Sequence, residues 1–362
     1  MIKLKIIFLY RYGILGGVCT QLYHRLRHLS DDMQMEIHCG FRSDHGVSEM
    51  LSPLATLHFG LNENNTAQFI DNQEFDVVII IDSEEYLKAC RNLSSNPKIL
   101  VEVHTSIERN LEYLCRIEKS GIDHFITVSK YMIERIDFHR SEQAKDIPIH
   151  LFENVLDTEL FTPNAGESVG PGVVLWVGKI DDHKDWRAYM QISHQISLSN
   201  QEVEFWIVGG QTCPEELAQE VFDYAEELGI IERFRWFDRI ENDFMSNLYS
   251  LVSCRGGVNL VTSHGESFGM AVLESLLSSC PVISSDVGAL SEITAESDYF
   301  KLYDLGDLQT AAKLCLKLLN DAENHTRTVQ ELLSVQESLR NQYSSSKRSS
   351  TYWKLIKSLG DE

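Results

Sequence analysis

The residues best suited to chemistry lie in the stretch 257–293. Glu266 and Glu274 flank a segment, 267–270, where an apolar strand gives way to a predicted helix. Backbone N–H groups at a helix N-terminus bind anions well. A phosphate held between two carboxylates indicates a ligand with hydroxyl groups on either side, as in a sugar-phosphate-nucleoside. Ordinary packing and helix capping explain the same pattern, so the ligand needs support from elsewhere in the chain.

Two lysines and a histidine are further candidates. Lys179 and Lys184 follow a predicted strand at 173–177, where two cations can converge on a diphosphate. His104 follows the apolar strand 98–103, and open α/β sheets bind ligands at the carboxyl ends of their strands. Taken singly, solvated lysines and an ordinary loop histidine are the simpler explanations.

The chain opens with a strand, a glycine loop and a helix. An apolar strand over 4–10 precedes Gly16 and Gly17, and a helix is predicted at about 18–29. Nucleotide-binding α/β domains begin in this way, but the dinucleotide fingerprint G-x-G-x-x-G is absent, which argues against NAD and FAD. Gly16 and Gly17 either let the backbone approach a ligand or form a tight turn.

The elements that would position these residues form two successive α/β series. Continuous apolar strands at 76–81, 98–103 and 125–128 indicate a parallel sheet covered on both faces. Residues 157–172 have the composition of a linker, after which strands and helices alternate again. A cleft between two such domains is a favoured place for a small-molecule site.

Length and composition limit the class of protein. The chain has 362 residues, enough for two domains, and its net charge of −22 argues against nucleic-acid binding. Eight cysteines without a C-x-x-C pair or a metal-spaced cluster predict reduced thiols in a cytoplasmic protein. No segment has the roughly 18–20 apolar residues that a membrane span needs.

Together these motifs resemble the retaining GT-B glycosyltransferases of glycosyltransferase family 4 (glycosyl transferases group 1). Glu266-Ser-Phe-Gly-Met with Glu274 resembles the E-x7-E signature, and Gly178-Lys179 with Lys184 resembles the G-R…K pair. The segment around His104 resembles the one that carries the family's active-site histidine. Further matches, in the family's order along nearly the whole chain, are 16–18, 128–129, 154–163 and 280–292.

The resemblance implies an α/β fold of the GT-B type, with two Rossmann-like domains facing each other across a cleft. We expect an N-terminal acceptor domain over 1–160 and a nucleotide-sugar donor domain over 161–340. A C-terminal helix over 341–362 is expected to pack back on the first domain.

The resemblance also implies a role for each motif. Lys179 and Lys184 would hold the donor diphosphate, since fixed cations stabilise the charge that builds on a departing nucleoside diphosphate. Glu266 would bind the transferred sugar with His104 over it, and Glu274 would bind the ribose. The implied catalytic residues are His104, Glu266, Lys179 and Lys184. The donor-binding set is Gly16, Gly17, Lys179, Lys184, Arg239, Ile240, Glu266, Ser267, Phe268, Gly269, Met270 and Glu274.

The implied function is retaining transfer of a hexose-type unit from a UDP- or GDP-linked sugar. The acceptor is left open among a sugar, a lipid-linked glycan and a small molecule, and no oligomeric state is predicted. No D-x-D motif is present, so a bound metal is not expected. The nucleotide diphosphate sugar is expected as a donor substrate, and no cofactor is expected beside it. Lys179 stands where the family usually has arginine. The alternatives are another GT-B enzyme, such as a synthase or phosphorylase, and a catalytically silent GT-B subunit.

The first thirty residues carry basic side chains and no acidic ones. His24, Arg25, Arg27 and His28 lie on the predicted first helix. We expect this helix face to meet an anionic acceptor or a membrane surface, which would make the protein peripheral to the membrane. A solvated helix face is the simpler alternative.

Overall fold

The computed structural model divides the chain into two units. Unit 1 comprises Met1–Leu156 and Tyr343–Glu362, and unit 2 comprises Asp157–Gln342. The described residues are 3–14, 16–30, 33–91, 93–118, 121–163, 170–210, 213–293, 299–320 and 325–361. Part of the predicted linker, 164–169, lies outside them.

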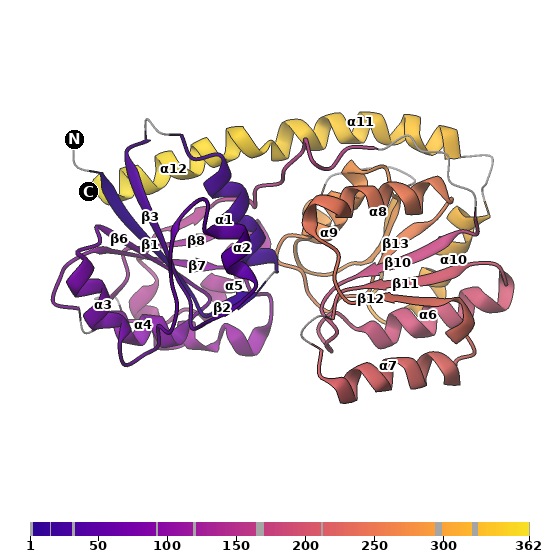
Figure 1. The fold of residues 1–362 in the computed structure, drawn as a ribbon, viewed down its shortest axis with the longest axis horizontal. Coiled ribbons are helices and arrows are strands. Elements are labelled where there is room, and N and C mark those ends of the chain that lie inside the picture. The colour runs from indigo at the N-terminus through magenta and orange to yellow at the C-terminus, as the bar shows by residue number, and fades with distance from the viewer. Residues whose placement is uncertain are drawn as a thin grey trace. The chain divides into compact units, whose positions relative to one another are not determined.

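Unit 1 is built on a seven-stranded parallel sheet with the order β5-β3-β1-β6-β7-β8-β9 (Figure 1). The central strand β6 (Val77–Ile81) is buried along its whole length, as expected for a continuous apolar run in a doubly covered sheet. The other strands are β1 (Leu4–Tyr10), β3 (Met35–Gly40), β5 (Thr56–His58), β7 (Lys98–Val103), β8 (His124–Thr127) and β9 (Ile149–Leu151). Two further short strands, β2 (Tyr12–Ile14) and β4 (Ser43–His45), pair in parallel with each other and form a separate two-stranded sheet.

The helices of unit 1 include the last helix of the chain. They are α1 (Gly17–Arg27), α2 (Val47–Leu51), α3 (Thr66–Gln73), α4 (Glu84–Cys90), α5 (Lys130–His139) and α12 (Ser345–Asp361). Ser129 caps α5 by accepting a hydrogen bond from the N–H of Met132. Tyr352, Trp353 and Ile356 of α12 are fully buried in the same core as β1, β6 and α1. The C-terminal helix therefore returns to unit 1 and completes its core.

Unit 2 is built on a six-stranded parallel sheet with the order β12-β11-β10-β13-β14-β15. The strands are β10 (Val173–Val177), β11 (Glu204–Val208), β12 (Phe234–Phe237), β13 (Val258–Val261), β14 (Val282–Ser285) and β15 (Phe300–Tyr303). The first strand, β10, pairs with β11 on one side and β13 on the other. The strand order thus reverses between β10 and β13, and ligands bind at such switch points in open α/β sheets.

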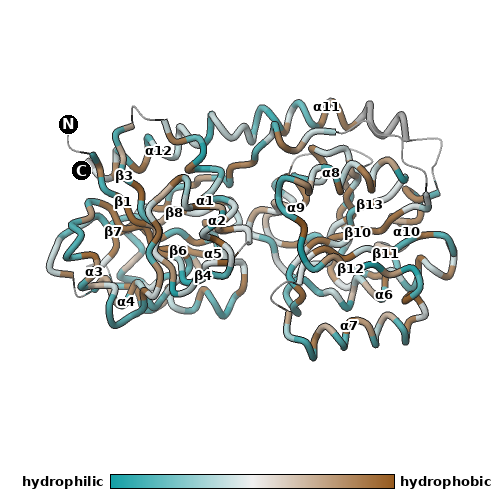
Figure 2. The backbone as a smooth tube through the Cα atoms, viewed as in Figure 1, coloured by the Kyte–Doolittle hydropathy of each residue, from teal (hydrophilic) through white to brown (hydrophobic). Residues whose placement is uncertain are grey.

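The helices of unit 2 cover both faces of the sheet. Figure 1 shows α6 (Trp186–Ser199) and α7 (Glu215–Glu227) on one face and α8 (Asn242–Cys254) and α9 (Met270–Leu277) on the other. Two further helices are α10 (Leu308–Leu319) and α11 (His325–Tyr343). In Figure 2 the hydrophobic colour gathers in the strands, in accord with the apolar core of each unit. The two Rossmann-like α/β domains predicted from the sequence are confirmed.

The basic face predicted for the first helix is wrong for two of its four residues. His24 and Arg25 of α1 are 0% and 1% exposed, whereas Arg27 is exposed. Burial leaves these two side chains unable to meet an anionic acceptor or a lipid surface. Among the described residues, no helix has both the length and the apolar character needed to cross a membrane.

Candidate active site

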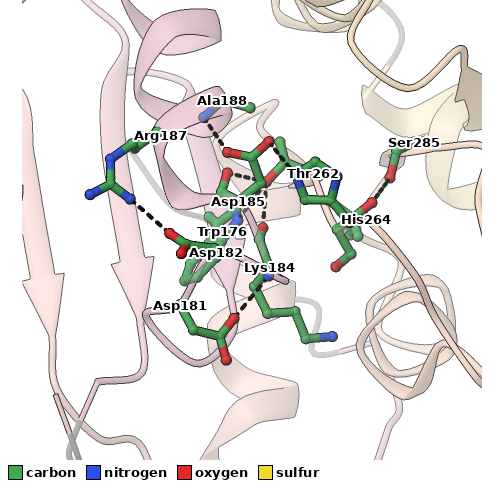
Figure 3. A network of polar contacts seen from close by, with 12 residues as sticks. Trp176, Asp181, Asp182, Lys184, Asp185, Arg187, Ala188, Thr262, His264 and Ser285 are labelled. Atoms are coloured by element: carbon green, nitrogen blue, oxygen red, sulfur yellow. Dashed lines mark hydrogen bonds and ion pairs between the residues drawn. The ribbon is translucent and has the colours of Figure 1, made fainter. Parts of the chain in front are cut away.

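The loop that follows β10 carries both candidate lysines. Its backbone is fixed by Asp181, whose carboxylate accepts from the N–H of Lys184 at 2.9 Å. Asp185 has a left-handed conformation with φ of +50° and caps α6 by accepting from the N–H of Ala188 at 3.0 Å (Figure 3). A non-glycine residue in this conformation stores strain, and such residues cluster at functional sites. The loop is therefore held in one shape by its own carboxylates.

A second loop, 262–269, leads from β13 to α9 and is fastened to the first. The hydroxyl of Thr262 lies 2.9 Å from the carbonyl oxygens of Lys184 and Asp185, and the indole N–H of Trp176 donates to it at 3.0 Å. The ring of His264 lies 3.1 Å from the carboxylate of Asp185 (Figure 3). The neighbouring strands β10 and β13 thus present two joined loops at the switch point.

Lys184 and Glu266 meet between these loops. The ammonium group of Lys184 donates to Oε1 of Glu266 at 2.5 Å, and the hydroxyl of Ser263 donates to the same oxygen at 2.7 Å. The two side chains are 29% and 15% exposed, so solvent and ligands still reach them. Lys179 lies on the same loop but is 62% exposed, with its ammonium group 3.9 Å from Asp181.

The start of α9 lies directly after Glu266, and Phe268 is buried there. Gly269 caps the helix with φ of +91°, and a Cβ at this position would lie 2.5 Å from a methyl carbon of Leu290. Glycine is therefore required both by the conformation and by the close packing. Ser267 and Met270 flank this turn and are half-buried.

Glu274 lies on the second turn of α9 and is buried. Its Oε2 accepts a hydrogen bond from the hydroxyl of Tyr249 at 3.4 Å. Burial raises the pKa of Glu274 from 4.5 to about 8, because removal from water disfavours the charged form. The carboxyl group of Glu274 therefore keeps its proton over most of the range between pH 4.5 and 8.

The backbone of the loop that carries Glu266 also packs closely against Gly288. The N–H of Ala289 donates to the carbonyl oxygen of Glu266 at 2.8 Å. A Cβ on Gly288 would lie 2.1 Å from that oxygen, and φ at this glycine is +59°. Backbone atoms of Gly288 and Glu266 can approach this closely only without a side chain between them.

Gly288→Ala is expected to lower the free energy of unfolding by about 2–4 kcal/mol, because it adds a backbone clash to a left-handed conformation. Gly229→Ala is the matched control, since Gly229 has φ of +68° and nothing within 4 Å of an added Cβ. The control should lose only about 1 kcal/mol. Urea denaturation of both variants measures the difference, and equal losses would contradict the clash.

Arg239 and Ile240 lie in the loop between β12 and α8. The guanidinium group of Arg239 pairs with Glu241 at 2.7 Å and is 29% exposed. Both residues are half-buried, on a loop at the carboxyl end of a strand that neighbours β11. The structure thus places them in unit 2 together with the lysines and Glu266.

The remaining candidates lie in unit 1. His104 follows β7. Its backbone N–H donates to Oδ1 of Asp82 at 2.9 Å, and its ring Nε2 lies 2.9 Å from Oε2 of Glu102. Gly16 precedes α1 with φ of −166°, an extended conformation that any residue adopts, and a Cβ on Gly16 or Gly17 would meet nothing within 4 Å. The tight turn considered as an alternative is therefore not required by the conformation of Gly16.

Sequence reasoning missed several polar residues that hold the candidates in place. Glu102, Asp185 and His264 are the main ones. Glu102 carried a signal, since a carboxylate inside the apolar strand 98–103 must be paired when it is buried. Asp185 and His264 lie far apart in the sequence, and only the pairing of β10 with β13 brings them together.

Comparisons with known proteins agree with this architecture. Residues 157–332 match the sequence model of the family described as glycosyl transferases group 1. HepE from Anabaena, solved in complex with UDP-glucose, superposes with a TM-score of 0.79 at 16% identity, over 98% of this chain and 99% of that one. Sucrose-phosphate synthase from Thermosynechococcus elongatus also gives 0.79, at 15% identity over 99% of each chain. The chain shares the GT-B fold of these two structures.

Among the relatives of this chain, two match a part of it. The 2-deoxystreptamine N-acetyl-D-glucosaminyltransferase of Niallia circulans is 24% identical over 43% of this chain and 38% of its own length. The D-inositol 3-phosphate glycosyltransferase of Corynebacterium efficiens is 25% identical over 51% of this chain and 43% of its own. The chain thus spans less than half the length of these relatives.

Proposed function

We propose that this protein is a retaining, metal-independent glycosyltransferase that moves a sugar from a UDP- or GDP-linked donor to a hydroxylated acceptor. The pair formed by Lys184 and Glu266 carries the proposal, because it sets a cation beside an accessible carboxylate at a switch point of the sheet. The match of residues 157–332 to the glycosyl transferases group 1 model supports it. The complex of HepE with UDP-glucose supports a nucleotide-sugar donor.

The proposed chemistry follows from charge. Cleavage of a glycosyl-diphosphate bond places negative charge on the departing nucleoside diphosphate, and a cation fixed at that point lowers the barrier. Lys184 is held in position by the loop, and the exposed Lys179 joins it when the diphosphate binds. Both contacts of Glu266 use Oε1, which leaves Oε2 to accept from a hydroxyl of the transferred sugar.

The other residues bind the donor or cover it. Amides of Ser267 to Met270 bind oxygens at the start of α9, as helix N-termini do. Glu274 accepts from the ribose hydroxyls, Arg239 and Ile240 lie near the base, and Gly16 and Gly17 give room beside α1. His104 acts on the transferred sugar. The acceptor is a sugar, a lipid-linked glycan or a small molecule, and the eight cysteines, none of them in a disulfide bond, support a cytoplasmic location.

A thermal-shift screen of UDP- and GDP-linked sugars tests the proposal. A donor that binds only the folded chain at a concentration 100 times its Kd stabilises the chain by about 2.7 kcal/mol. Transfer to a panel of acceptors should then give a product with the donor's anomeric configuration, with or without EDTA. Absence of any shift and of any turnover would contradict the proposal.

The alternative is a catalytically silent GT-B subunit. Such a protein would show stabilisation by a nucleotide sugar, or none, without donor hydrolysis or transfer. Lys184 and Glu266 favour the enzyme, because a half-buried cation and carboxylate with no substrate to bind add little stability for their cost in desolvation.

A further inference from the structure

A buried polar network connects the C-terminal helix to His104 within unit 1. Arg25 of α1 donates to both carboxylate oxygens of Glu102, at 3.1 and 2.8 Å. The hydroxyl of Tyr352 in α12 donates to Oε1 of Glu102, and His104 contacts Oε2 at 2.9 Å. Arg25, Glu102 and Tyr352 are each no more than 1% exposed.

The helix α12 is attached to this network at two further points. The indole N–H of Trp353 donates to the carbonyl oxygen of Arg25 at 2.9 Å. The guanidinium carbon of Arg25 lies 4.2 Å from the centre of the Tyr352 ring, as in a cation–π contact. Three elements separated in the sequence, α1, β7 and α12, therefore share one buried charge pair.

The network determines the protonation of Glu102. Burial alone would raise the pKa of this carboxyl group, but the charge of Arg25 and the hydrogen bonds from His104 and Tyr352 lower it to about 2. An ionised carboxylate only accepts hydrogen bonds. In the contact between them, the Nε2–H of His104 must therefore be the hydrogen-bond donor and Glu102 the acceptor. In the tautomer with this Nε2–H, Nδ1 is the acceptor atom of the ring.

We propose that Glu102 is a positioning residue that fixes the orientation and tautomer of His104, and that Tyr352 of the C-terminal helix holds Glu102 for this task. The effect of Glu102 on turnover depends on the function proposed above, whereas the effect of Glu102 on the tautomer of His104 does not. A buried ion pair adds little stability compared with well-packed apolar residues. Because Glu102 also contacts His104, the pair of Arg25 and Glu102 can orient the histidine, and this role does not depend on a contribution to stability.

A structural explanation competes with this proposal. The same network could serve only to attach α12 to the core of unit 1. Removing the Tyr352 hydroxyl would then lower stability and leave the imidazole of His104 unchanged. The tautomer of His104 separates the two explanations, because attachment of a helix does not select which ring nitrogen carries the proton.

Tyr352→Phe is the decisive variant, since it removes one hydroxyl and keeps the buried ring. Tyr86→Phe is the matched control: Tyr86 is also fully buried in unit 1, and its hydroxyl donates to the carbonyl oxygen of Leu61 at 3.2 Å. Nitrogen-15 NMR of histidine-labelled full-length protein reports the tautomer, with the His104 signals assigned by their loss in His104→Asn.

In the parent and in Tyr86→Phe, neutral His104 should be the Nε2–H tautomer alone. In Tyr352→Phe, the Nδ1–H tautomer should appear, and kcat should fall about tenfold with KM unchanged. Glu102→Gln should shift the tautomer of His104 further. If Glu102→Gln does not fold, because Arg25 has lost the charge opposite it, Tyr352→Phe alone still tests the proposal.

Two outcomes would overturn the inference. One is an unchanged tautomer in Tyr352→Phe, whatever happens to its stability or rate. The other is an Nδ1–H tautomer in the parent protein. Absence of transfer by the parent would instead refute the proposed function, and the NMR result would still decide the role of Glu102.

Discussion

Lys184→Ala is expected to lower kcat/KM for sugar transfer by about 10²–10³, because the departing diphosphate loses a cation fixed beside it. The fold should survive, since the lysine side chain is 29% exposed and its backbone N–H still donates to Asp181 at 2.9 Å. Initial rates with a saturating acceptor and varied donor measure the effect, and the melting temperature measures the integrity of the fold.

Lys313→Ala is the matched control for this prediction. Lys313 is an exposed lysine of α10 in the same unit, so its removal changes net charge by the same amount without touching the switch-point loops. It should transfer sugar at the parent rate. Equal rates for Lys184→Ala and the parent would refute the role assigned to Lys184.

Glu274→Gln is expected to remove a pH dependence of stability from the parent protein. Because the folded-state pKa of Glu274 is raised from 4.5 to about 8, the folded chain keeps a proton that the unfolded chain releases in this interval. The stabilising contribution is complete below pH 4.5 and is lost as the pH rises toward 8. Over this interval the contribution of Glu274 to the free energy of unfolding falls by about 1.4 kcal/mol per pH unit.

Urea denaturation at several pH values in this interval measures that slope. Glutamine keeps the shape of the side chain and an acceptor for Tyr249 but has no proton to lose. The free energy of unfolding of this variant should therefore change less with pH, and its stability relative to the parent should grow as the pH rises. Glu227→Gln, an exposed carboxylate at the end of α7, should retain the parent slope. Parallel curves for the parent and Glu274→Gln would show that burial does not hold the proton there.

The sequence was sufficient to predict most of the architecture and the loops of unit 2. Continuous apolar runs such as 76–81 predicted buried parallel strands, and the breaks after β10 and β13 predicted where ligand-binding residues would lie. These signals are local. The strands β2, β3, β4, β5 and β15 were not predicted. Of these, β5 and β15 are short strands at sheet edges that are only partly buried, so their apolar pattern is weak.

The polar residues behind His104 show why the rest could not be predicted. Arg25 resembles a solvated basic residue on its helix, yet it is buried and paired with Glu102, which lies 77 residues further along the chain. Tyr352, the other partner of Glu102, is 250 residues from it. No window of sequence contains such a network, and its members can be recognised only when the sheet and the last helix are assembled.

The discontinuity of unit 1 sets an order of events during synthesis on the ribosome. Residues 1–156 are translated before unit 2, but the hydrophobic core they form lacks Tyr352 and Trp353 until α12 has been translated. Unit 2, which lies wholly between these segments, can finish folding before them. Unit 1, which begins before unit 2 along the chain, is thus completed after it.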